Sequence, residues 1–274
     1  MPRFTLTNRS DVFESDDEAG WTDGSQVWGG NGSDTIRIEG DRNLVAGGNG
    51  EDVLVAFGDR NRLDGGNGKD DLRATGDDNR LYGGNGVDCL VANGEGNLLD
   101  GGNGADWLVS SSRGGFREIG EGNVLTGGQG HDAFALNNRS DLRVVNDTQG
   151  HAHPNLPPAP GGVGVVSEGD IIVGVMDEIT DYTAGERIRI GAKVEARDPV
   201  GLDDFSPVHR HLELADGEYA FIRGDQTGNG RFEVNEDGGD LLLVYDARGG
   251  GDALYLQGAV VLQGMTDPDA VFVC

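Results

Sequence analysis

The stretch that decides the fold is GGNGEDVLVAFGDRNRLDGGNGKDDL, residues 47–72, in which one pattern occurs twice. GGNG begins at residue 47 and again at residue 65, and each copy is followed, one residue later, by an aspartate. GGNG also begins at residues 29, 83 and 101, so the step is 18 residues each time. A sixth copy, GGQG, begins at residue 127, after an insertion of eight residues. A fixed period of this kind predicts a repeat architecture.

Each period divides into two halves of nine residues, GGNGxDxUx and xxGDxNxUx, where U is apolar. The glycines of the first half predict a chain reversal through backbone angles that are closed to residues with a Cβ. The last three residues of each half predict a very short strand with one inward apolar side chain. The apolar positions are Ile36, Leu54, Leu72, Leu90, Leu108 and Phe134 in the first halves and Val45, Leu63, Leu81, Leu99 and Leu125 in the second.

Two halves therefore make one coil, and coils stack at the strand spacing of about 4.8 Å. The apolar side chains are then buried between two parallel sheets. One coil has almost no core of its own, so stability has to come from stacking. The expected fold class is all-β, a parallel β-roll followed by a β-rich C-terminal domain.

Stacking places the first-half aspartates of adjacent coils about 5 Å apart, where two carboxylates repel by roughly 3 kcal/mol at an effective dielectric constant near 20. Calcium would relieve this repulsion, because it takes about 6–8 oxygen ligands at about 2.3–2.6 Å. Two carboxylates from adjacent coils and backbone carbonyls of the glycine turns can supply them, which predicts about four or five calcium ions along this edge. The candidate ligand residues are Gly29, Asn31, Asp34, Gly47, Asn49, Asp52, Gly65, Asn67, Asp70, Gly83, Asn85, Asp88, Gly101, Asn103, Asp106, Gly127, Gln129 and Asp132.

The segments GGNGEDVLV, GGNGKDDLR, GGNGVDCLV and GGNGADWLV resemble the nonapeptide repeat of the RTX (repeats-in-toxin, hemolysin-type calcium-binding) family. The resemblance covers residues 29–135. It implies a right-handed parallel β-roll that stays largely unfolded until calcium binds.

The second halves depart from the family pattern, because asparagine stands where the family has aspartate. These residues are Asn43, Asn61, Asn79, Asn97 and Asn123. Two interpretations remain open: weak ion binding by the nearby Asp41, Asp59, Asp77, Glu95 and Glu121, or an asparagine ladder from coil to coil that needs no metal.

The chain divides into an N-terminal cap (1–28), the roll (29–146), a Pro- and Gly-rich linker (147–164) and a C-terminal β-rich domain (165–274). The flanks LTNRSDVF (6–13) and LNNRSDLR (136–143) resemble each other and are interpreted as the two ends of the stack.

The C-terminal domain contains GDQTGNGRFEVNE, in which Asp225, Thr227, Asn229 and Glu236 match ligand positions of an EF-hand loop. A further calcium site and a plain Asn-Gly hairpin are both compatible with this stretch. The region 165–274 is similar to the C-terminal region that follows the repeats in serralysin-type proteins. That similarity implies type I (ABC) secretion through a C-terminal signal.

Asp and Glu number 48 against 21 Lys and Arg, a net charge of -27, which argues against nucleic acid or an anionic membrane as a partner. The N-terminus has no apolar stretch behind a basic start, so no secretory signal peptide is expected there, and no apolar run is long enough to span a membrane. No HExxH or GxSxG motif occurs. We therefore expect a secreted, extracellular, non-enzymatic calcium-binding protein. The alternative is an adhesion or surface-matrix protein whose C-terminal domain binds a cell-surface partner or glycan.

Overall fold

The structure is a computed structural model that describes residues 2–15, 23–111, 120–136, 143–146, 163–164, 171–173, 175–183, 185–190, 211–212, 219–228, 230–235, 237–246, 257–271 and 273. The chain folds as two units. The first unit contains Met1–Ser111 and Asn123–Ala135, and the second contains Ser112–Gly122 and Leu136–Cys274.

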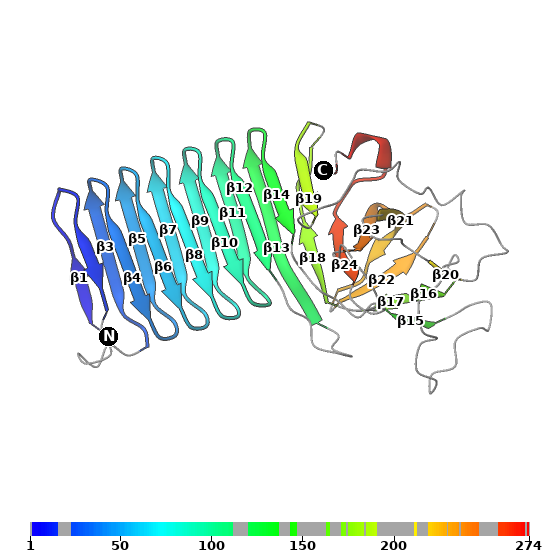
Figure 1. The fold of residues 1–274 in the computed structure, drawn as a ribbon, viewed down its shortest axis with the longest axis horizontal. Helices are drawn as coiled ribbons and strands as arrows, with labels where there is room; N and C mark the ends of the chain where they lie inside the picture. Colours follow the sequence, from blue (N-terminus) through cyan, green and yellow to red (C-terminus); the bar gives the residue numbers. More distant parts are fainter. Residues whose placement is uncertain are drawn as a thin grey trace. The chain divides into compact units, whose positions relative to one another are not determined.

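The first unit is a parallel β-roll, as the 18-residue period predicts (Figure 1). Its chain alternates between two sheets, so that successive strands along the sequence belong to opposite sheets. The first sheet has the order β1 (Arg3–Thr5), β3 (Gln26–Asn31), β5 (Leu44–Asn49), β7 (Arg62–Asn67), β9 (Arg80–Asn85), β11 (Leu98–Asn103) and β13 (Gly120–Gln129). The second has the order β2 (Val12–Glu14), β4 (Thr35–Glu39), β6 (Val53–Phe57), β8 (Asp71–Thr75), β10 (Cys89–Asn93), β12 (Trp107–Ser111) and β14 (Ala133–Leu136).

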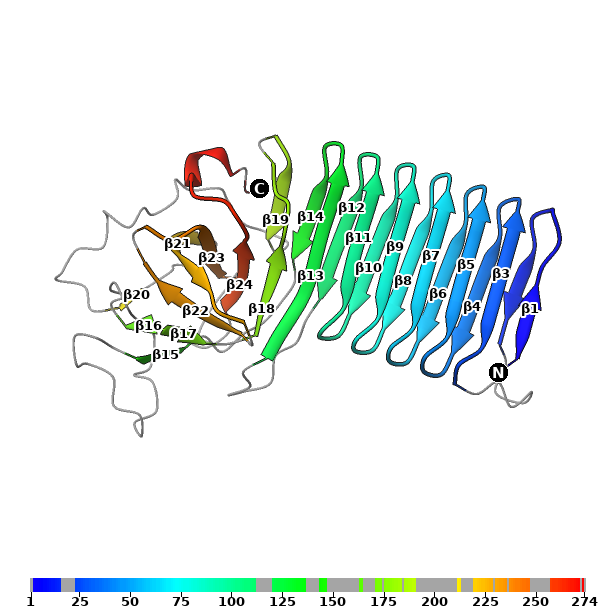
Figure 2. The ribbon, with the colours of Figure 1, turned by 180° about the vertical axis from the view of Figure 1, so that it is seen from behind.

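Strands of adjacent coils pair in register, so that equal positions of the repeat stack on one another (Figure 2). Leu54 pairs with Leu72 in the second sheet, and Leu63 pairs with Leu81 in the first. The predicted apolar positions are all at most 1% exposed and form the core between the sheets. The first-half strands add a second inward row, which the sequence analysis did not identify: Ile38, Ala56, Ala74, Ala92 and Ser110.

The strands are longer than the three residues that the sequence analysis expects. Strand β6 has five residues and β7 has six. The first-sheet strands run on into the glycine pairs, since these glycines also pair across the ladder, as Gly66 does with Gly84. Glycine is required there because of the neighbouring coil. A Cβ on Gly68, whose φ is +133°, would lie 2.6 Å from the carbonyl carbon of Gly50.

The first coil of the roll is a glycine-free copy of the repeat. Strands β1 and β2 pair with β3 and β4, which aligns LTNRSD (6–11) with GGNGSD (29–34). Thr7 and Arg9 thus take the places of Gly30 and Gly32. Among the described strands, no earlier coil lies against Thr7 and Arg9, so the side chains that the other coils exclude are accepted here.

The second unit is also built of strands, in the order β18 (Val175–Ile179), β24 (Gln257–Leu262), β23 (Asp240–Asp246), β21 (Tyr219–Gln226), β22 (Arg231–Val234), β17 (Ile171–Val173) and β15 (Arg143–Asn146). Strands β16 (Val163–Gly164) and β20 (His211–Leu212) pair separately, and β19 (Arg187–Ile190) and the 3-10 helix η3 (Pro268–Ala270) complete the unit. The β21–β23–β24 pairs are antiparallel and their buried side chains, among them Ile222, Leu242 and Val261, give this unit its own core. Of the predicted linker, only residues 163–164 are described. No helix in the described parts of the chain is long and apolar enough to cross a membrane.

Candidate metal site: the aspartate column

The first-half aspartates form one buried column along an edge of the roll. Each lies between a glycine turn and the following strand of the second sheet, and each is at most 2% exposed. The δ1 oxygen of each aspartate accepts a hydrogen bond from the main-chain N–H of the equivalent residue in the preceding coil, as Asp70 does from Asp52 at 2.8 Å. The same bond links Asp11 to Asp34, Asp34 to Asp52, Asp70 to Asp88, Asp88 to Asp106 and Asp106 to Asp132 at 2.7–2.8 Å. The predicted stacking of these carboxylates is thus present.

The second carboxylate oxygen has no hydrogen-bond donor. The Oδ2 atoms of Asp34, Asp52, Asp70, Asp88 and Asp106 are buried and unpaired. A buried acceptor without a donor costs about 1–3 kcal/mol, and more when it carries charge. In five consecutive turns, the same buried carboxylate oxygen therefore has no hydrogen-bond donor beside it.

A main-chain carbonyl oxygen of the next coil lies beside this carboxylate oxygen. A Cβ placed on Gly65 would lie 2.5 Å from Oδ2 of Asp70 and 2.7 Å from the carbonyl oxygen of Gly83. A Cβ on Gly101 would lie 2.5 Å from Oδ2 of Asp106 and 2.6 Å from the carbonyl oxygen of Gly127. Both oxygens are acceptors that border the same space, where a cation or a proton would interact favourably with them.

The first glycines of the turns leave room for this arrangement. The same convergence occurs at Gly29, where Asp34 and the Gly47 carbonyl meet, and at Gly83, where Asp88 and the Gly101 carbonyl meet. Any larger residue at these positions would occupy the space beside the carboxylate. The glycines that the sequence analysis selected are thus placed next to the aspartates.

Burial raises the pKa of these carboxyl groups. The pKa of Asp70 rises from 3.8 to about 7 and that of Asp106 from 3.8 to about 6; in both, burial is the largest cause, and neighbouring aspartates add to it. The pKa of Asp34, Asp52 and Asp88 is also raised, first by burial. The ionised column is therefore destabilised in the absence of a counter-ion.

The oxygen atoms that border this space are suitable ligands for a hard divalent cation. Carboxylate and carbonyl oxygens are the ligands of calcium. Within the described residues, no three His, Cys, Asp or Glu side chains are grouped as a metal site. An ion here would consequently draw much of its ligand shell from main-chain carbonyls, in addition to the aspartates.

The turn asparagines occupy a different place from the aspartates. Asn31, like its equivalents, is exposed, whereas Asp34 is buried. The exposed amides form a ladder in which each Nδ2 donates to the Oδ1 of the preceding coil. The ladder runs from Asn103 to Asn85, Asn67, Asn49, Asn31 and Asn8, with bonds of 2.7–2.9 Å. Gln129, at the same position of the last copy, is exposed as well. The structure thus does not bring these predicted ligands together with the carboxylates.

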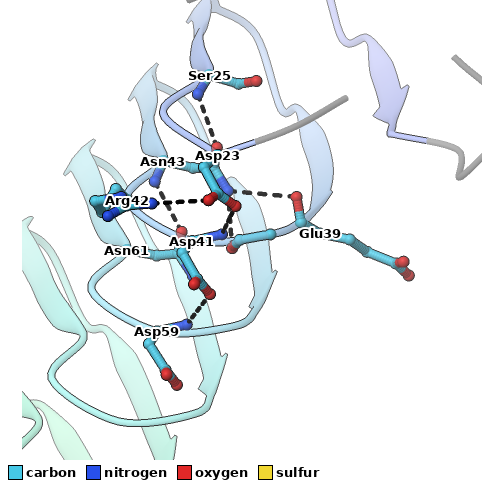
Figure 3. Close-up of polar contacts among 9 residues, drawn as sticks. Asp23, Ser25, Glu39, Asp41, Arg42, Asn43, Asp59 and Asn61 are labelled. Atoms are coloured by element: carbon cyan, nitrogen blue, oxygen red, sulfur yellow. Dashed lines mark hydrogen bonds and ion pairs between the residues drawn. The ribbon is translucent and has the colours of Figure 1, made fainter. Parts of the chain in front are cut away.

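An asparagine ladder occupies the opposite edge of the roll, where the sequence analysis leaves two interpretations open. The Oδ1 of Asn61 accepts from the main-chain N–H of Asn43 at 2.8 Å (Figure 3). The same bond recurs from Ser25 to Asn43, Asn61 to Asn79, Asn79 to Asn97 and Asn97 to Asn123. The amide oxygens thus accept from the main chain, while Nδ2 of Asn43 donates to the carbonyl of Gly40 at 2.9 Å.

Four acidic residues of the second halves, Asp41, Asp59, Asp77 and Glu95, are exposed or half-buried in their turns. Asp41 accepts from the N–H of Asp59 at 2.8 Å (Figure 3). Asp59 in turn accepts from the N–H of Asp77 at 2.9 Å. Arg42 pairs with Asp23 at 2.8 Å. These carboxylates therefore stabilise the turns through main-chain hydrogen bonds. In the asparagine ladder of this edge, Nδ2 of Asn61 and Nδ2 of Asn79 are buried without a hydrogen-bond partner.

Asp11 is a member of the column that the sequence analysis missed. It stacks before Asp34, but its Oδ2 accepts from the N–H and the hydroxyl of Thr7, both at 2.7 Å. The column thus ends on a carboxylate that is satisfied within its own turn. The shared spacing of Asn8 and Asp11 with Asn31 and Asp34 is the sequence signal that identifies it.

The predicted C-terminal calcium loop lies between two antiparallel strands, β21 and β22. Thr227 N–H donates to the Arg231 carbonyl at 3.0 Å, which closes a hairpin. The carboxylate of Asp225 accepts from the Gly239 N–H at 2.9 Å and from Asn235 Nδ2 at 3.2 Å. Asn229 and Glu236 lie outside the described residues. The hairpin is present, and a metal at this site stays a prediction.

Comparison with known proteins adds no relative: no protein-family model matches the chain, and no curated protein matches it significantly.

Proposed function

We propose that this protein is a calcium-binding β-roll whose folding is coupled to ion binding along the aspartate column. The observation that carries the proposal is the set of five buried Oδ2 atoms without a donor, at four of which a carbonyl oxygen of the next coil converges. An ion between these oxygens removes both the unmet acceptor and the repulsion between neighbouring carboxylates. We expect about four or five ions in the roll.

Coupling to folding follows from the position of the ligands on adjacent coils. The two ligand oxygens, Oδ2 of Asp70 and the carbonyl oxygen of Gly83, come from successive coils and lie together only when those coils are stacked. Binding energy is then folding energy, because the unfolded chain has no such pair. Each site contributes about 2.7 kcal/mol when free calcium is a hundred times the dissociation constant.

We propose that the protein functions outside the cell and is not an enzyme. The low calcium of a cytosol leaves the carboxylate column self-repelling, which keeps the chain unfolded for type I export, and calcium outside completes the roll. Export by this route is supported only by the resemblance of residues 165–274 to the region that follows RTX repeats in exported proteins.

The test is a calcium titration of the chelator-treated full chain, followed by circular dichroism and calorimetry. We expect a cooperative gain of β-structure and heat from several sites. A matched pair of variants locates the ions: Asp70→Asn removes a column carboxylate, and Asp64→Asn removes an equal charge that pairs with Arg62 outside the column. Asp70→Asn should lower the number of bound ions, and Asp64→Asn should not. Unchanged binding in Asp70→Asn, or no binding in the native chain, overturns the proposal.

A further inference from the structure

Every complete glycine turn before the last contains an asparagine followed by a glycine. The pairs are Asn31-Gly32, Asn49-Gly50, Asn67-Gly68, Asn85-Gly86 and Asn103-Gly104. Asparagine is a thermolabile residue. A following glycine has no Cβ to shield its backbone nitrogen, which makes the pair the most reactive context for deamidation.

The reaction is balanced without any cofactor. The glycine nitrogen attacks Cγ of the asparagine, the new N–Cγ bond closes a succinimide ring, and the Cγ–Nδ2 bond breaks. Nδ2 leaves as ammonia with the proton from the glycine nitrogen. Water then opens the ring, giving either aspartate or isoaspartate, in which the main chain continues through the former side chain.

Both reacting groups are held in the stacked roll. The N–H of Gly50 donates to the Asn67 carbonyl and the N–H of Gly68 donates to the Asn85 carbonyl, each at 2.8 Å. The remaining three glycines make the same bond to the following coil at 2.7–2.8 Å. Each asparagine amide is fixed in the exposed ladder, with Nδ2 donating at 2.7–2.9 Å. The nucleophile therefore points along the stack, and the ring cannot close until a coil opens.

We propose that these five Asn-Gly turns are deamidation sites that coil stacking protects, so that deamidation of the turns accumulates while the roll is unfolded. The inference depends on stacking only, and it holds whether or not calcium drives that stacking.

The damage would prevent the roll from forming again. A new carboxylate at position 67 could no longer donate to Oδ1 of Asn49, and two acceptors would then face each other in the ladder. Isoaspartate lengthens the main chain in a turn that has no spare volume, since even a Cβ on Gly68 would collide with the Gly50 carbonyl. A chain aged in the unfolded state should thus fail to refold in proportion to its deamidation.

The sequence provides two internal controls. Gln129-Gly130 keeps the glycine but has a longer side chain, which disfavours the ring. The buried asparagines of the second halves keep the side chain but precede larger residues, namely Leu44, Arg62, Arg80, Leu98 and Val124.

The experiment incubates the full chain in mildly alkaline buffer, in parallel folded and in concentrated urea, and follows each asparagine by peptide mass spectrometry. The chain's two other Asn-Gly pairs, Asn93-Gly94 and Asn229-Gly230, lie outside these turns and are followed separately. In urea the five pairs of the glycine turns should react and both internal controls should not. In the folded chain the same pairs should react at least about tenfold more slowly, which corresponds to an opening free energy of about 1.4 kcal/mol. Equal rates in the two states while circular dichroism reports an intact roll, or no preference for the pairs over the controls in urea, overturn the inference.

Refolding supplies the second readout. Chains aged in urea and then returned to folding conditions should recover less β-structure than chains unfolded briefly, and the lost fraction should carry the deamidated peptides. A variant in which these five asparagines, Asn93 and Asn229 are all changed to glutamine has no Asn-Gly pair and should refold equally well after either treatment. If that variant does not fold at all, the mass-spectrometric comparison on the native chain still decides. Full recovery of a deamidated native chain contradicts the second half of the inference.

Discussion

Asp70 accepts a hydrogen bond of 2.8 Å from the main-chain N–H of Asp52. On the other edge of the roll, Asn61 accepts the same bond, at the same length, from Asn43. The two columns therefore use one geometry and differ only in the second side-chain atom, which is an acceptor in aspartate and a donor in asparagine. This equivalence makes the two residues exchangeable in a test.

The first prediction concerns Asp70→Asn. The amide nitrogen would lie beside the Gly83 carbonyl and donate to it, where the carboxylate oxygen had no donor. We expect the metal-free variant to be more stable than the metal-free native chain by about 1–3 kcal/mol. Urea unfolding in chelator measures this. Asp64→Asn, outside the column, should stay within about 0.5 kcal/mol of the native chain, and a destabilised Asp70→Asn variant would contradict the prediction.

The second prediction is the reverse exchange, Asn79→Asp. Asn79 is fully buried between Asn61 and Asn97, with its Oδ1 accepting from the main chain. An ionised carboxylate there would be buried without a counter-ion, so we expect a loss of at least about 1–3 kcal/mol in chelator at neutral pH. Adding calcium or lowering the pH should restore part of the loss. If unfolding in urea shows the variant and the native chain to be equally stable in chelator, the ladder does not require a neutral side chain.

The third prediction is a pH dependence of the metal-free protein. The folded-state pKa of Asp70 is about 7 and that of Asp106 about 6, against 3.8 for the ordinary group, mainly because of burial. The folded state thus binds these protons more tightly than the unfolded state, and protonation stabilises the fold. The stabilisation is complete below about pH 3.8 and is lost as the pH rises through about 6 to 7.

Urea midpoints measured in chelator across this range should therefore fall as the pH rises. Saturating calcium should flatten the profile, because the cation replaces the protons. The double variant Asp70→Asn, Asp106→Asn controls for the general repulsion within a chain of net charge -27, and its profile should be less steep. Identical slopes for the variant and the native chain would show that other groups carry the dependence.

The period of the repeat predicts the stacking, the apolar core and the aspartate column, because register places equal positions of every coil together. It does not predict which side of a turn a polar residue occupies. Asn31 and Asp34 belong to one turn, yet the positive φ angles of Gly30 and Gly32 turn the chain so that only the aspartate is buried. The pattern also misses Asp11, because the glycines that mark the motif are required by the preceding coil, and the described strands place no coil before Thr7 and Arg9.

The last prediction separates glycines that stacking requires from glycines that it does not. Gly68→Ala combines a φ of +133° with a collision against Gly50, and should cost about 3 kcal/mol or more. Gly96 has a φ of +67°, and the equivalent positions hold Arg60 and Asp78 with φ values of 58° and 59°. Gly96→Arg should therefore remain within about 1 kcal/mol of the native chain, since the arginine can take the conformation that Arg60 already has. Thermal unfolding of the two variants measures the contrast, and equal losses would mean that backbone conformation, and not contact between coils, selects glycine in this roll.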